Sequence, residues 1–208
     1  LISLLRVLVG TPINTILTIL VAYPLSRSRK EFRARGFFVW FFLITVLFSG
    51  GLIPWYMVIR QTGLIDNFWA LIIPGALPVF NVILVANAFR NIPKELEEAA
   101  AIDGAGHWTI LFRILLPLSL PVLATVTLFV AVAHWNAWFD GLILMNSPDK
   151  YPLQSYLQTI VVIADPRMLT ERDLALLKII NNRTTRAAQI FIAMVPILVI
   201  YPFLQRYF

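Results

Sequence analysis

Long stretches of the chain contain no Asp, Glu, Lys or Arg, and short polar segments separate them. A transmembrane helix needs about 20 mainly apolar residues to cross the hydrocarbon core of a bilayer. Five charge-free stretches meet this requirement: Val7–Ser26, Gly36–Ile59, Asn67–Phe89, Ile114–Phe139 and Ala187–Gln205. The pattern therefore predicts five spans in one transmembrane domain that covers residues 1–208.

Nine prolines fall within these stretches: Pro12, Pro24, Pro54, Pro74, Pro78, Pro117, Pro121, Pro196 and Pro202. Proline removes a backbone donor, but membrane spans tolerate it because neighbouring helices and polar side chains satisfy the freed carbonyls. We therefore expect kinked or interrupted helices.

The composition agrees with a membrane protein. Hydrophobic residues make up 59% of the chain, charged residues 13%, and the mean hydropathy is +0.79. These values exclude an ordinary water-soluble domain. The absence of cysteine excludes disulfides and thiolate metal sites.

The net charge of +6 does not indicate nucleic-acid binding, because five of the basic residues lie in the single short loop 27–35. This is the pattern of the positive-inside rule. It predicts loops that alternate between the two sides, with 27–35 and 90–113 in the cytoplasm and 60–66 and 140–186 outside. Leu1 would then lie outside, so we expect a further N-terminal span, six in all.

The predicted cytoplasmic loop 91–113 contains an amphipathic segment. Pro93 is suited to the first turn of a helix and Gly104 to its end. Acidic residues gather near the start, while Leu96, Ala99, Ala100 and Ile102 offer an apolar surface of mainly small residues. A second helical run begins at Gly106. The two predicted helices form a knob that could engage a partner, although amphipathicity alone also fits an ordinary re-entry loop.

The spacing in this loop resembles a known motif. Glu98-Ala99-Ala100, then Gly104, then Ile114-x-Leu116-Pro117 is similar to the EAA loop of binding-protein-dependent ABC importer permeases. The flanking residues, among them Ile92-Pro93, Asp103-Gly104-Ala105 and Pro117-Leu118-Ser119, resemble the carbohydrate-uptake branch. The resemblance extends over most of the chain, from Tyr23-Pro24-Leu25-Ser26-Arg27 to Tyr201-Pro202.

This resemblance implies an all-α, multi-pass protein of the bacterial cytoplasmic (inner) membrane with the type I ABC importer fold. Its partners would be a second homologous permease subunit, two ATP-binding subunits, an extracytoplasmic solute-binding protein and membrane lipids. The short helix at Glu95–Asp103 would be a coupling helix that seats in a groove of the ATP-binding subunit. Glu98 would pair there with a basic residue of the ATPase. The implied coupling residues are Glu95, Glu98, Ala99, Ala100, Asp103 and Gly104.

The chain contains no G-x-x-x-x-G-K-[ST] sequence that could cradle ATP phosphates. We therefore expect no cofactor or metal in this chain and no enzymatic role, with ATP and Mg bound by the partner ATPase subunits. The two histidines, His107 and His134, are far apart in the topology and are interpreted as hydrogen-bonded packing residues.

Several polar and aromatic residues are candidates for a substrate pathway. Indole rings can stack on sugar faces and amides can bond to hydroxyls, so the candidates are Asn81, Asn87, Trp135, Asn136 and Trp138. An aromatic belt at the headgroups, or hydrogen bonds between helices, would explain the same residues. By resemblance, the external loop 146–186 contacts the binding protein, with Tyr151-Pro152-Leu153 near its start.

By this resemblance, the expected function is import of a carbohydrate, either an oligosaccharide or a polysaccharide fragment, with an acidic fragment such as alginate among the candidates. A permease for amino acids or peptides is the nearest alternative. A channel or carrier outside the ABC class is disfavoured, because the charge-free stretches lack the intramembrane acids that usually carry protons.

Overall fold

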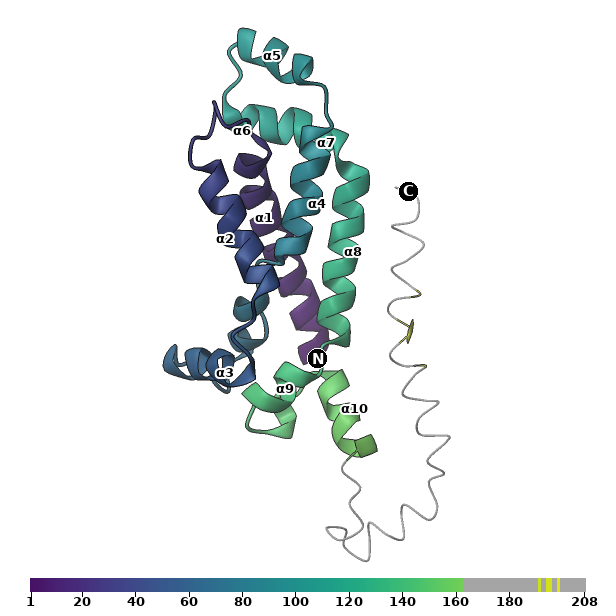
Figure 1. The fold of residues 1–208 in the computed structure, drawn as a ribbon. Coiled ribbons are helices and arrows are strands. Elements are labelled where there is room, and N and C mark those ends of the chain that lie inside the picture. Colours follow the sequence, from purple (N-terminus) through teal and green to yellow (C-terminus); the bar gives the residue numbers. More distant parts are fainter. Residues whose placement is uncertain (163–190, 192–193, 196–197, 199–208) are drawn as a thin grey trace, which may run out of the picture.

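The computed structural model describes residues 1–162, 191, 194–195 and 198 (Figure 1). All regular structure in this part of the chain is helical. Most of the predicted fifth span, at 187–205, and the external loop beyond residue 162 lie outside the described residues.

The central element is α1 (Ile2–Ser26), which packs between α4 (Val79–Arg90) and α8 (Leu120–Asn136) (Figure 1). Its 25 residues would extend about 37 Å, enough to cross a bilayer. The prolines Pro12 and Pro24 lie inside it without interrupting it. Apolar side chains cover its exposed face, whereas its buried face includes polar and small residues: Ser3, Arg6, Gly10, Thr11, Asn14 and Thr18.

The second charge-free stretch does not form one straight span. Helix α2 (Arg35–Leu47) ends before a break at 48–51, and α3 (Leu52–Gln61) leaves at an angle of 116°. Gly51 has a φ of +84°, which glycine adopts without the penalty of a Cβ. Hydropathy predicted correctly that this stretch is apolar and helical, but it did not predict the change of direction.

The third stretch is also interrupted. It begins with two 3₁₀ helices, η1 (Phe68–Leu71) and η2 (Ile73–Gly75), and continues into α4 after a bend of 49°. Pro74 lies in the first turn of η2 and Pro78 directly precedes α4. Here the proline-based expectation of an interrupted helix is confirmed.

The fourth stretch is bent near its start, at Ser119. α6 (His107–Ile110), the π-helix η3 (Leu111–Leu115) and α7 (Leu116–Leu118) form one run, and α8 leaves it at 83°. α8 ends at Asn136, so the last part of the predicted span, through Phe139, is not in this helix. Among the described residues, α1 alone is long and apolar enough to cross a membrane unbroken, and up to four spans result if each bent pair counts as one.

Loops from distant parts of the sequence gather at the two ends of the bundle. One end carries α5 (Lys94–Ile102) and α6 beside the end of α1, and the other carries α3, α9 (Phe139–Leu144) and α10 (Leu153–Val162) (Figure 1). The short η4 (Pro148–Lys150) connects α9 and α10. This grouping agrees with the predicted alternation of loops, and the assignment of one end to the cytoplasm stays a prediction.

Candidate functional site

Helix α5 is the outermost element at its end of the bundle (Figure 1). Pro93 precedes its first residue, and Glu95 and Glu97 occupy the first turn, where the helix dipole favours carboxylates. Gly104 ends the helix with a φ of +81°, and the Ala105 N–H donates to the Ala100 carbonyl at 2.9 Å. The helix start and the glycine stop predicted from the sequence are therefore both present.

One face of α5 is exposed and includes apolar side chains. Ile102 is 87% exposed, and Trp108 on the neighbouring α6 is 64% exposed. Five of the six predicted coupling residues are exposed as well: Glu95, Glu98, Ala99, Asp103 and Gly104. Ala100 instead packs against the hydrophobic core. Exposed apolar residues rimmed by polar ones are typical of a surface that a partner covers.

The inward face of α5 is fixed to α1 by an ion pair. Arg27 follows the last residue of α1 and pairs with Glu97, with its Nη2 donating to Glu97 Oε1 at 3.2 Å. Both side chains are largely buried, at 12% and 14% exposure. The Arg27 guanidinium also lies 4.6 Å from the centroid of the Tyr23 ring. The Tyr23 hydroxyl is 3.0 Å from His107 Nδ1, so the end of α1 holds both α5 and α6.

Two further arginines cap the end of α1. Arg35 Nε and Arg90 Nη2 both donate to the Leu25 carbonyl, at 3.0 and 2.6 Å, where the helix dipole favours positive charge. A cavity of about 280 Å³ lies between this cap and α5, and Glu98 is among its lining residues. In the loop 27–35, the Ser28 N–H donates a hydrogen bond to the Glu31 carboxylate and thereby lowers the pKa of that carboxyl.

The other end of α1 carries a buried ionic cluster. Arg6, only 4% exposed, pairs with Asp140 and donates from Nε to His134 Nδ1 at 3.3 Å. One turn along α1, Gly10 lies against the same ring, so closely that a Cβ there would be 2.6 Å from His134 Nε2. His134 is thus a hydrogen-bonded packing residue, as expected, but its partner is an arginine.

Sequence reasoning did not find this cluster. Arg6 directly precedes the first charge-free stretch, and Asp140 directly follows the fourth. Because the predicted topology places both at the same membrane surface, an ion pair between them could have been suggested. A charged residue that is as buried as Arg6 needs a partner.

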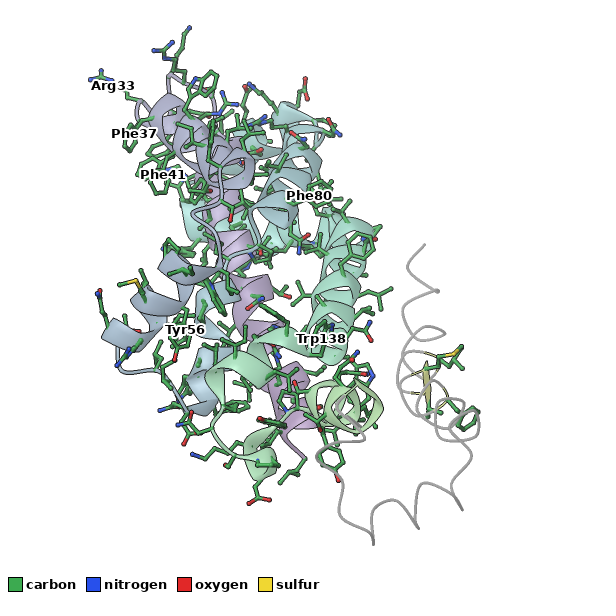
Figure 2. All side chains as sticks on the ribbon, turned by 60° about the horizontal axis from the view of Figure 1, so that its bottom comes forward. Arg33, Phe37, Phe41, Tyr56, Phe80 and Trp138 are labelled. Atoms are coloured by element: carbon green, nitrogen blue, oxygen red, sulfur yellow. The ribbon has the colours of Figure 1, made fainter. Side chains whose placement is uncertain are left out.

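The candidates for the substrate pathway are not all brought together. Asn136 and Trp138 line one cavity of about 560 Å³, whereas Trp135 is buried. Asn81 is buried in α4, and Asn87 borders a different cavity, of about 200 Å³, between α2 and α4. Figure 2 shows Trp138 near the end of α8 and Tyr56 on α3, and both elements meet at the same end of the bundle in Figure 1.

The start of the predicted external loop is packed against the bundle. The Lys150 ammonium forms an ion pair with Asp66, and the hydrogen bond between them lowers the pKa of the Asp66 carboxyl. Pro152 is fully buried, and the Leu153 N–H donates to the Ser3 hydroxyl at 2.5 Å. Within the described part of the chain, no group of three or more metal-ligating side chains occurs.

Comparison with known proteins identifies the family. Residues 3–208 match the family model described as the inner membrane component of binding-protein-dependent transport systems. The chain is 38% identical over 208 residues to the polygalacturonan/rhamnogalacturonan transport system permease protein YtcP of Bacillus subtilis (strain 168), covering all of this chain and 72% of that protein. It is 40% identical over 207 residues to protein LplC of the same organism, covering all of this chain and 69% of LplC.

A solved structure shares the fold. A chain from a bacterial ABC transporter involved in the import of the acidic polysaccharide alginate superposes with a TM-score of 0.88 at 33% identity, and the match covers all of this chain and 73% of that one. The resemblance inferred from the EAA-like loop is therefore confirmed at the level of the family and its fold. The chain belongs to the family of inner membrane components of binding-protein-dependent transport systems.

Proposed function

We propose that this chain is a permease subunit of an ABC importer that moves an oligosaccharide or polysaccharide fragment across the bacterial inner membrane. Several of its relatives are named as sugar permeases, including those for polygalacturonan/rhamnogalacturonan and maltodextrin. Acidic polysaccharide fragments are the favoured substrates, because one such relative and the alginate importer both match the whole chain.

The proposal includes the partners that such an importer needs. A second permease chain completes the pathway, two ATPase subunits bind ATP and Mg, and an extracytoplasmic binding protein delivers the sugar. The single observation that carries the coupling role is the exposed face of α5, whose opposite face is tied to α1 through Arg27 and Glu97. A push on α5 would therefore reach α1 through a fixed contact.

Glu98 is the proposed charge partner of the ATPase. It is exposed on α5, and the neighbouring Ala99 has a small side chain that permits close approach. Glu98 also borders the cavity between α5 and the arginine cap of α1, so docking would need a basic groove in the ATPase that reaches this carboxylate.

The substitution Glu98→Lys tests this role in a reconstituted complex. We expect ATP hydrolysis stimulated by the loaded binding protein to fall at least about tenfold, or the complex not to assemble, because opposed like charges cost several kcal/mol. Gln61→Lys introduces a lysine at an exposed position at the end of α3, at the opposite end of the molecule, and should keep the hydrolysis rate. Equal hydrolysis by wild type and Glu98→Lys would remove Glu98 from the coupling surface.

A further inference from the structure

We propose that the 560 Å³ cavity at the α3–α9 end binds a sugar ring through the uncharged faces and hydroxyls of the sugar. This inference deepens the proposed function and rests on it. The cavity is bounded by three separate elements. Trp55 comes from α3, Asn136 from the end of α8, and Trp138 and Asp140 from the start of α9. We call these four residues the outer cavity set.

The side chains of this set match the chemistry of a pyranose. A sugar ring has faces formed by C–H groups and an edge of hydroxyls, and the two indole rings supply flat apolar surfaces for such a face. The Asn136 amide can both donate to and accept from hydroxyls. Mostly apolar walls with a few oriented polar groups are typical of small-molecule sites.

The buried cluster beneath the cavity holds its carboxylate in place. Asp140 Oδ1 accepts from Arg6 Nη1 at 3.1 Å and from the Gly141 N–H at 2.9 Å, while Oδ2 is paired with Arg6 Nη2. A carboxylate offers about four lone-pair sites, so Asp140 retains one for a hydroxyl of the ligand. Arg6 also donates to His134 and is 4% exposed, so it remains beneath the cavity floor.

The charge of the cavity indicates which part of a sugar it accepts. The described residues that line it include no Lys or Arg, and the charge of Asp140 is balanced by Arg6. A sugar carboxylate would therefore find no cation there to offset its loss of water. The cavity is suited to ring faces and hydroxyls, and the carboxylates of an acidic fragment must be neutralised by other surfaces of the importer.

Cysteine protection tests the site directly, since the chain has no cysteine of its own. Ala133→Cys and Ser49→Cys place a thiol on two walls of the cavity, in complexes whose partner subunits also lack cysteine. The probes are maltotriose and trigalacturonate, added without binding protein. At ten times the dissociation constant, each sugar should slow maleimide labelling about tenfold, with little dependence on salt. Asn146→Cys, exposed outside the cavity, should react at an unchanged rate.

A matched pair of tryptophan variants separates the site from the rest of the protein. Trp138→Ala should abolish the protection of Ala133→Cys, whereas Trp40→Ala, which removes an exposed indole from α2, should keep it. Protection that survives Trp138→Ala would overturn the proposal. The proposal would also be overturned if neither sugar slowed labelling. The same holds if only trigalacturonate slowed labelling and high salt removed that effect.

Two controls distinguish failure of the site from failure of the proposed function. Thiols that react in the isolated subunit but not in the assembled complex would show that the partner permease covers the cavity, and this would overturn the site. If the same complex still hydrolyses ATP in response to loaded binding protein, the importer function stands without this site. Loss of that response in the wild-type complex would instead contradict the proposed function.

Discussion

Individual charges fix both ends of α1. Arg6 pairs with Asp140 near its start, and Arg27 pairs with Glu97 just after its end, so each contact joins residues far apart in the sequence. A buried charge without a partner is expensive, and this favours the present geometry over alternatives in which either arginine is unpaired. α1 is therefore tied to α9 at one end and to the proposed coupling helix at the other.

Substitution of Glu97 by Gln should weaken this connection. Removing one partner of a largely buried pair leaves Arg27 uncompensated, so we expect a loss of about 3 kcal/mol in the free energy of unfolding, measured by SDS titration of the purified protein. Glu95→Gln changes an exposed acid on the same helix and should cost close to nothing. The connection would be disproved if the two variants were equally stable.

Gly10 offers a second prediction at the residue scale. A methyl group at this position would lie 2.6 Å from His134 Nε2, so Gly10→Ala should destabilise the protein by about 1–3 kcal/mol through overpacking. Gly36→Ala is the matched control, because nothing lies within 4 Å of the added Cβ and alanine favours the helix. Thermal unfolding in detergent measures both, and the packing around His134 would be in doubt if Gly10→Ala raised the unfolding temperature as Gly36→Ala should.

At the scale of the element, the turn between α5 and α6 depends on one glycine. Gly104 has a φ of +81°, a conformation that strains a residue with a Cβ. Gly104→Ala should therefore lower the free energy of unfolding by about 1–2 kcal/mol and reduce ATP hydrolysis stimulated by the binding protein. Gly106→Ala introduces the same methyl group at an ordinary φ of −75° and should have little effect on hydrolysis. If both variants behaved as wild type, the geometry of this turn would not matter for coupling.

The sequence predicted the elements better than their directions. Charge-free stretches identify segments compatible with lipid because composition alone determines that property. Proline content predicted that these stretches would be kinked or interrupted, but not where the bends after Leu47 and at Ser119 lie or how large they are, since a hydropathy window carries no information about helix direction. Proline was an unreliable guide: Pro78 precedes a new helix, whereas Pro12 lies within an unbroken one.

Prediction of the candidate site had a similar limit. The helix around Glu98 and its glycine stop were readable because both are local signals. The contact between Arg27 and Glu97 joins residues 70 positions apart, and no local pattern indicates it. Trp135 is buried, whereas its neighbour Asn136 lines a cavity. This difference depends on the rotation of α8 about its axis, which is set by its packing against α1 and α4.

At the scale of the whole molecule, the two ends of the bundle differ in kind. One presents an exposed short helix with acidic and apolar side chains, and the other presents a cavity with indole rings above a buried ion pair. α1 connects the two ends, so displacement of α5 could be transmitted to the outer cavity. This arrangement fits a subunit that uses energy received at one surface to change access at the other.

Uptake of a labelled oligosaccharide into proteoliposomes tests the central claim most directly. The complex of this chain with the proposed partner permease and ATPase subunits is compared with a complex in which the ATPase is catalytically inactive. Uptake should require the loaded binding protein and ATP, and it should fall to background with the inactive ATPase. Uptake that continues undiminished with the inactive ATPase would contradict the assignment of this chain to an ATP-driven importer.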